Sequence, residues 1–187
     1  MGVSAQARLH TSSATSRPHP GRSGGAGGLQ ANLPTRLTRL GQQAPHVTVE
    51  AWAFDQHRVG LQPILRRVWA PKGNRPVVPV QPRYEWLYVY AFVQPSTGRT
   101  YWLLLPTVNA AIVSQALALF AREVGAGPDR RILLTLDQAG FHTAQAVEVP
   151  EGIELEFLPA HSPELQPAER LWPRLDQALA NHHFADR

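Results

Sequence analysis

Three acidic residues, Asp55, Asp137 and Glu169, are of a type that could bind metal ions and transfer a phosphoryl group. Hard divalent cations such as Mg²⁺ prefer oxygen ligands, typically a few carboxylates completed by water and substrate phosphate. Two such ions about 3.5–4 Å apart can activate the attacking oxygen and stabilise the leaving one. Most acids in a folded chain are merely solvated, and Asp55 alone also suits a turn. The chemistry therefore depends on whether the three acids meet.

Two apolar runs, residues 132–136 and 153–158, are predicted strands that would position two of these acids. The first run ends at Asp137, and open α/β sheets place their ligands at the carboxyl ends of strands. The second run leads through a Pro-rich turn into a predicted helix, residues 164–182, which carries Glu169. We therefore expect the helix to bring its acid to the strand edge that holds Asp137.

The remaining strands are predicted in the first half of the chain. Residues 47–54 form a strand that ends at Asp55, with a turn near Gly60. Residues 85–93 and 99–105 are strongly apolar strands joined by a tight turn, so we expect an antiparallel pair buried on both faces. Their aromatic side chains are predicted to be core residues in preference to a base-stacking platform: Trp86, Tyr88, Tyr90, Phe92 and Trp102.

Helical periodicity appears in three places. Residues 109–124 are amphipathic and end at a Gly-rich stretch, and residues 143–147 suit a short helix. In the last helix, leucines repeat along one face, and Pro173 is expected to kink it. The order of strands and helices predicts an α/β fold with a mixed five-stranded sheet and helices on both faces, as in ribonuclease H-like proteins.

The 187 residues, 43% of them apolar, suffice for one domain with a real core. The chain has no Cys and no run of about 18 apolar residues, so disulfides, thiolate sites and a membrane span are not expected. Residues 1–46 are rich in Gly, Ser and Pro and hold five Arg and no acid. We predict a disordered basic tail there, either a DNA-touching arm or a linker remnant, and a folded domain over residues 47–187.

Residues 61–83 contain five Pro, which forbid a helix and favour a protruding hairpin with strands near 66–69 and 77–80. Basic side chains on and beside it could lie along a phosphate backbone, or they could merely protect a solvated edge. The candidate phosphate contacts are Arg58, Arg66, Arg67, Lys72 and Arg75, which form a basic cluster with Arg83.

Two sequence blocks carry a family resemblance. The block DQAGFH begins at Asp137, and LPAHSPELQPAERLW, residues 158–172, contains Glu169. Together they resemble the DDE-type transposases of bacterial insertion sequences related to the mariner group, and WAPKG at 69–73 is similar to the same family. The resemblance covers about residues 47–184.

Carried over position by position, the resemblance makes Asp55, Asp137 and Glu169 the catalytic, metal-binding triad. It implies Mg²⁺ as cofactor, with Mn²⁺ able to substitute, and metal-dependent cleavage of transposon ends followed by strand transfer into target DNA. The implied partners are these DNAs and a second copy of the chain, with no membrane, in a bacterial cytoplasm and at the nucleoid when DNA is bound. His142 could orient a phosphate or a water, or serve as a helix cap or core residue.

Some features depart from the family pattern. Gln56, Gln138 and Gln166 stand where Glu, Asn and Asn are usual, although no triad acid is lost. Residues 1–46 show no pattern for the helix-turn-helix modules that read transposon ends, and the chain ends early compared with the family. These departures suggest a truncated catalytic domain. Two alternatives stay open: a ribonuclease H-type nuclease without strand transfer, and an inactive remnant that at most binds DNA.

Overall fold

The computed structural model describes residues 25–43, 46–62, 64, 69–74, 77, 83–160 and 162–180. Among the predicted features, most of the Pro-rich hairpin lies outside these residues, as do Arg66, Arg67 and Arg75. No helix in the described part of the chain is both long and apolar enough to cross a membrane.

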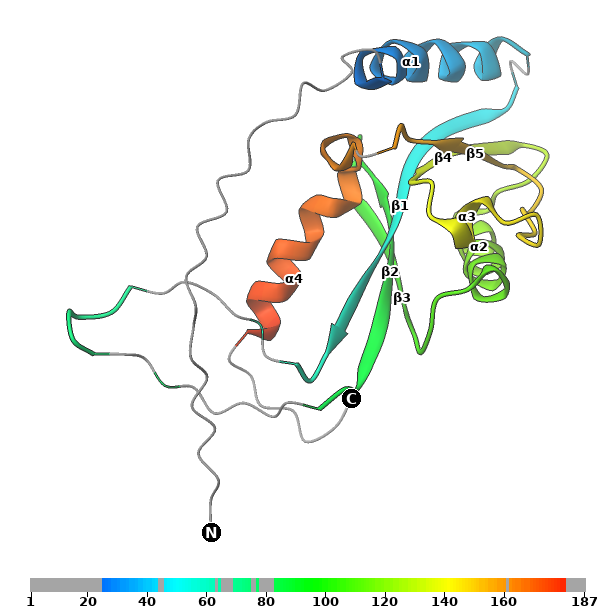
Figure 1. Cartoon of the computed structure of the whole chain (residues 1–187). Helices are drawn as coiled ribbons and strands as arrows, with labels where there is room; N and C mark the ends of the chain where they lie inside the picture. Colours follow the sequence, from blue (N-terminus) through cyan, green and yellow to red (C-terminus); the bar gives the residue numbers. More distant parts are fainter. Residues whose placement is uncertain are drawn as a thin grey trace.

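A five-stranded mixed sheet forms the centre of the molecule (Figure 1). Its strands are β1 (Thr48–Gly60), β2 (Trp86–Gln94), β3 (Arg99–Leu105), β4 (Arg130–Leu136) and β5 (Ile153–Phe157), in the spatial order β3-β2-β1-β4-β5. β1 pairs antiparallel with β2 and parallel with β4, while β2–β3 is antiparallel and β4–β5 is parallel. This arrangement confirms the predicted ribonuclease H-like sheet.

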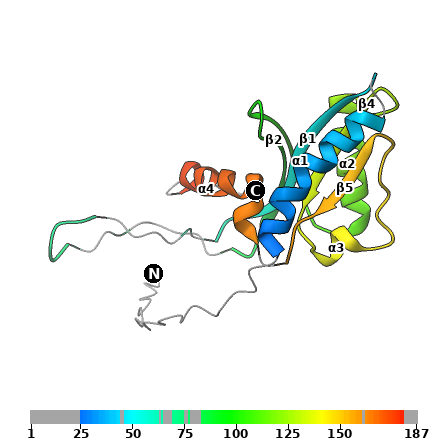
Figure 2. The ribbon, with the colours of Figure 1, turned by 90° about the horizontal axis from the view of Figure 1, so that it is seen from above.

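One face of the sheet is covered by α2 (Ala110–Val124) and the short α3 (Gly140–Thr143), as Figure 2 shows from above. Alternate residues of the strands point to this face and form an aromatic stack in which Phe92 lies between Phe54, at 4.3 Å, and Phe120, at 4.1 Å. Asn109 caps α2 by accepting a hydrogen bond from the backbone of Ile112, and Gly125 ends the helix in the left-handed conformation that favours glycine.

The opposite face carries the last helical segments. These are the 3₁₀ turns η1 (Pro163–Leu165) and η2 (Pro167–Leu171), followed by α4 (Trp172–Leu179). Ala168 and Trp172 pack there against the β2 residues Val89, Ala91 and Val93. The central strands β1, β2 and β4 are therefore covered on both faces, and the two packed layers hold the acid-bearing elements in place.

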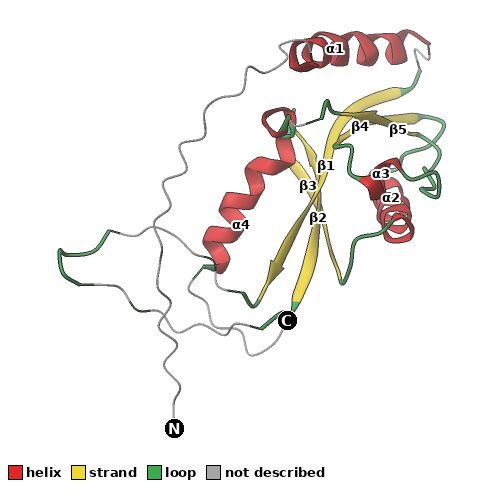
Figure 3. Ribbon diagram, viewed as in Figure 1, coloured by secondary structure: helices red, strands yellow, loops and turns green. Residues whose placement is uncertain are grey.

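A helix in the predicted tail is the main departure from the sequence-based prediction. α1 (Gly25–Gln43) lies along the sheet, where the Gly-rich composition predicted no structure (Figure 3). Leu40 is buried, and the Arg36 guanidinium pairs with the carboxylates of Glu156 and Glu154 on β5. Packing against the sheet thus overrides weak local propensity.

Several predicted boundaries were also wrong. β1 continues to Gly60, so Asp55 lies inside a strand instead of after one. α3 begins at Gly140, earlier than the predicted 143–147 helix. The predicted helix 164–182 is divided, over its described residues, into η1, η2 and α4, and each begins with a proline in its first turn, where proline is tolerated, so Pro173 starts a helix and does not kink one.

β3 is an edge strand and is not buried on both faces as predicted. Its burial alternates, leaving Trp102 39% and Leu104 66% exposed. The β2 aromatics Tyr90 and Phe92 are fully buried, as the core interpretation requires. In the Pro-rich segment, the described residues include a turn in which the amide of Asn74 donates to the carbonyl of Pro71 at 3.0 Å.

Candidate active site

Asp55 projects from β1 onto the face that carries η2 and α4. It pairs with Ala91 in the antiparallel ladder, and its Oδ2 accepts a hydrogen bond of 2.7 Å from the indole nitrogen of Trp172. Burial raises the pKa of Asp55 from its ordinary 3.8 to about 6; the hydrogen bonds from Trp172 and the Gln56 backbone oppose this increase. The negative charges of Glu169 and Asp137 raise the pKa further, so the three predicted acids interact electrostatically.

Asp137 follows β4 directly, as predicted. The parallel register pairs Ala53 with Thr135, two residues before Asp55 and Asp137, so the two acids arrive at the same level on adjacent strands. Oδ1 of Asp137 accepts from the ring Nδ1 of His142 at 2.6 Å and from the backbone amide of Ala139 at 3.1 Å. The His142 hydrogen bond is the largest cause of a lowered Asp137 pKa, against the smaller effect of burial.

Glu169 lies in η2, and the buried Gln166 fixes the start of that turn. The Gln166 amide nitrogen donates to the carbonyl of Phe54, one residue before Asp55, at 2.9 Å. Gln166 Oε1 accepts from the amide of Ala168. The Gln166 side chain, which is only 4% exposed, therefore hydrogen-bonds the segment that carries Glu169 to the strand that carries Asp55.

A second attachment joins α4 to β1. Trp172 stacks on His57 with ring centroids 5.0 Å apart, and His57 Nε2 lies 2.9 Å from Oδ1 of Asp176. With the indole bonded to Asp55, these contacts make Trp172 both a core residue and a partner of the acid.

The donor set suits a hard divalent cation, because oxygen ligands come from three separate elements and one of them is a partly desolvated carboxylate. The geometry is open. Among the described residues, no group of three His, Cys, Asp or Glu side chains is placed to hold a metal ion. The structure thus brings Asp55 and Asp137 to the same level on neighbouring strands and places Glu169 in η2, with no closed metal site among the described residues.

The candidate phosphate contacts are distributed differently. The Arg58 guanidinium lies over the Trp86 ring, 4.8 Å from its centroid, at the far end of β1. Lys72 lies in the described turn of the Pro-rich segment, and the carbonyl of Arg83 accepts from the side chain of Gln62. His142 is buried and faces Asp137, unlike a side chain that contacts DNA.

Sequence reasoning treated Gln56 and Gln166 only as departures from a pattern. Both make side-chain hydrogen bonds beside the acids, Gln56 to His142 and Gln166 to the Phe54 carbonyl. Their only signal in the sequence was position, since Gln56 adjoins Asp55 and Gln166 lies three residues before Glu169.

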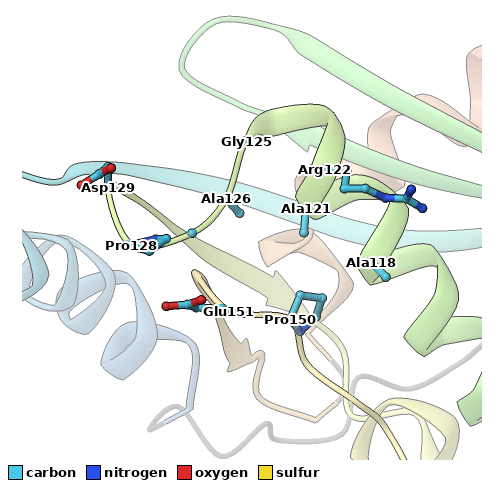
Figure 4. A pocket seen from close by; sticks show the side chains of 10 residues that line it. Ala118, Ala121, Arg122, Gly125, Ala126, Pro128, Asp129, Pro150 and Glu151 are labelled. Carbon is cyan, nitrogen blue, oxygen red and sulfur yellow. The ribbon is translucent and has the colours of Figure 1, made fainter.

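A hollow of about 520 Å³ lies away from these acids, where α2 ends (Figure 4). It is lined by small residues of the α2 end and by charged side chains at its rim, among them Arg122, Asp129 and Glu151. None of the three acids lines it, so the hollow is not part of the candidate site.

Residues 50–187 match a family model described as DDE superfamily endonuclease. The uncharacterized protein y4pE/y4sA of Sinorhizobium fredii is 38% identical over 102 residues, which are 54% of this chain and 74% of that protein.

Two solved structures share the fold. The Mos1 transposase paired-end complex with left transposon end superposes with a TM-score of 0.58 at 21% identity, covering 95% of this chain and 55% of that one. The Mos1 mariner paired end complex with Mn gives 0.59 at 23% identity, covering 90% and 53%. The chain thus spans about half the length of these transposases.

Proposed function

Since the chain belongs to the DDE superfamily of endonucleases, we propose that it cleaves DNA strands with the help of divalent cations bound by Asp55, Asp137 and Glu169. The observation that supports this most is the strand register that brings Asp55 of β1 level with Asp137, the residue after β4, while Trp172 bonds Asp55 next to the turn that carries Glu169. Burial is the main cause of the raised pKa of Asp55, and the two neighbouring acids raise it further, so the three carboxylates form a local cluster of negative charge. Such a cluster attracts a cation.

The residues would divide the work as follows. Mg²⁺ or Mn²⁺, when bound, would polarise the scissile phosphate and activate the attacking oxygen, which is water in cleavage and the freed 3′-hydroxyl in strand transfer. Asp55 and Asp137 would hold the ion from adjacent strands, while Glu169 would approach from η2. Trp172 and His142 each occupy one oxygen of an aspartate and so restrict its orientation. DNA phosphate would complete the ligand set of the open site.

We further propose that the chain joins the cleaved DNA ends to target DNA by strand transfer. The Mos1 structures named above are transposase complexes with transposon-end DNA, and this chain shares their fold. We infer that the cleaved ends are those of a mobile element in a bacterial cell and that a second copy of the chain takes part. The proposed phosphate contacts are Arg58 and Lys72 on the described part of the chain, and Arg66, Arg67 and Arg75 outside it.

One observation favours a second candidate function. The three acids do not close around an ion among the described residues, and a site that never closed would leave a protein that only binds DNA. A nuclease of ribonuclease H type would share the metal site but would release its products without joining them.

A cleavage assay separates these functions. Supercoiled plasmid is incubated with Mn²⁺ or Mg²⁺ and the wild type, Asp137→Asn or the control Glu123→Gln, whose carboxylate is exposed on α2. We expect nicking by the wild type and the control and a loss above about 100-fold in Asp137→Asn. Equal nicking by Asp137→Asn would refute the triad. Binding without nicking by every protein would favour the DNA-binding module.

A further inference from the structure

His142 is the most deeply buried titratable side chain beside the acids. The residue is 2% exposed and packs between Phe54, at a centroid distance of 5.4 Å, and Phe141, at 4.7 Å. Its two ring nitrogens nevertheless both meet polar partners. Nδ1 lies 2.6 Å from Oδ1 of Asp137, and Nε2 lies 2.8 Å from the amide nitrogen of Gln56.

The chemistry of the partners fixes the direction of these bonds. The amide nitrogen of Gln56 carries only hydrogens, so it donates and His142 Nε2 accepts. The imidazole proton is then on Nδ1, and this N–H donates to the carboxylate of Asp137. Two consecutive hydrogen bonds therefore run from Gln56 through His142 to Asp137 and link β1 to the residue after β4. Gln56 and His142 are 86 positions apart in the sequence, and His142 and Asp137 are 5 apart.

These hydrogen bonds hold one oxygen of Asp137 in place. Oδ1 accepts from both His142 and the backbone amide of Ala139, whereas Oδ2 accepts no hydrogen bond from any described residue. A carboxylate held through one oxygen can rotate little about its Cβ–Cγ bond. Its other oxygen then has a defined direction, as for outer partners that orient metal ligands.

We propose that His142, oriented by Gln56, is a positioning residue that holds Oδ1 of Asp137 and presents Oδ2 to the metal ion. This inference rests on the proposed metal-dependent function and deepens it. It replaces a direct DNA contact by His142, because the ring is buried and both of its nitrogens are occupied by protein. Gln56 donates to Nε2 of His142 and so stabilises the tautomer that carries its proton on Nδ1.

Three substitutions at His142 separate positioning from packing. His142→Asn places an amide nitrogen where Nδ1 was and can still donate to Asp137. His142→Gln reaches toward Gln56 but places no donor on Asp137, and His142→Ala removes both contacts. The matched control is Val113→Ala, a fully buried α2 residue in the same core that touches no acid.

Mn²⁺ affinity is measured by calorimetry, plasmid nicking is followed against Mn²⁺ concentration, and thermal unfolding is recorded for each variant. We expect His142→Ala and His142→Gln to weaken Mn²⁺ binding and nicking by about 10–100-fold, as for other outer-shell partners of metal ligands. His142→Asn should recover most of that loss, and Gln56→Leu should show a smaller loss in the same direction. Val113→Ala should lose thermal stability while its Mn²⁺ affinity stays at the wild-type level.

Two results would overturn the assignment while leaving the proposed function standing. One is wild-type Mn²⁺ affinity in His142→Ala while Asp137→Asn has lost binding. The other is an equal loss in all three His142 variants that follows their thermal stability, because packing alone would then explain it. Absence of both Mn²⁺ binding and nicking in the wild type would instead remove the proposed function and this inference with it.

Discussion

The indole N–H of Trp172 donates a 2.7 Å hydrogen bond to Oδ2 of Asp55, joining two residues that are 117 positions apart. Trp172 begins α4, and Glu169 lies three residues before it in η2. The bond therefore ties the segment that carries Glu169 to the strand that carries Asp55. It also supplies a donor to a carboxylate that burial has partly deprived of water.

Trp172→Phe tests this link, because phenylalanine keeps the aromatic packing against His57 but has no N–H group. We expect the free energy of unfolding to fall by about 1–3 kcal/mol, as for loss of a hydrogen bond to a charged group. The pKa of Asp55 should rise above its present value of about 6, since a bond that lowers it is gone. Urea unfolding at pH 8 measures the first effect. Unchanged stability would show that the indole N–H is not engaged in solution.

Asp55→Asn should make the fold more stable at high pH. A carboxyl whose pKa is higher in the folded state favours folding when protonated; that contribution is complete below 3.8 and is lost as the pH rises through about 6. Removing the charge should therefore add up to about 3 kcal/mol to the free energy of unfolding at pH 8, since Asn can still accept from Trp172. At pH 4 the gain should vanish. A constant difference at both pH values would contradict the raised pKa.

The affinity for Mn²⁺ should depend on the ionisation of the Asp55 carboxyl. A cation must displace the Asp55 proton, so Mn²⁺ affinity should increase about tenfold per pH unit below 6 and level off above it. Calorimetric titrations at pH 5, 6, 7 and 8 measure this. Asp55→Asn removes this ligand and should weaken Mn²⁺ binding as Asp137→Asn does. Any binding that remains should show no step near pH 6, and a step that persists there would assign the ionisation to another group.

Arg36 forms the ion pairs that join α1 to β5. Arg36→Gln removes the ion pairs with Glu154 and Glu156, while Arg39→Gln removes an exposed charge from the same helix. Because such pairs contribute little to global stability, we expect a change of less than about 1 kcal/mol in both variants. Hydrogen exchange in α1 should increase in Arg36→Gln alone. Equal exchange in the two variants would mean that Leu40 and its apolar neighbours hold the helix unaided.

Local patterns predicted the sheet well. The apolar run before Asp137 correctly predicted where β4 ends. The tight turn between β2 and β3 correctly predicted that these strands pair antiparallel. α1 was missed because its first residues are Gly-rich, and its apolar residues, Leu33, Leu37 and Leu40, become informative only when a sheet lies beneath them. Pro173 was read as a kink, although it starts a separate helix.

That the three acids form one metal site stays a prediction, and the hydrogen-bond partners of Asp55 and Asp137 were not predicted. The bonds of His142 to Gln56 and of Trp172 to Asp55 cross 86 and 117 positions, and no local period records such contacts. They follow from the sheet register, which only the three-dimensional structure supplies.

The central claim is that Asp55, Asp137 and Glu169 form one divalent-metal site, and calorimetric titration with Mn²⁺ tests it most directly. The wild type, Asp137→Asn and the control Glu123→Gln are each titrated at pH 8, first alone and then with a DNA duplex, whose phosphates can complete the ligand set. We predict Mn²⁺ binding by the wild type and the control and its loss in Asp137→Asn. Equal binding by all three proteins, or none by the wild type even with DNA, would contradict the account.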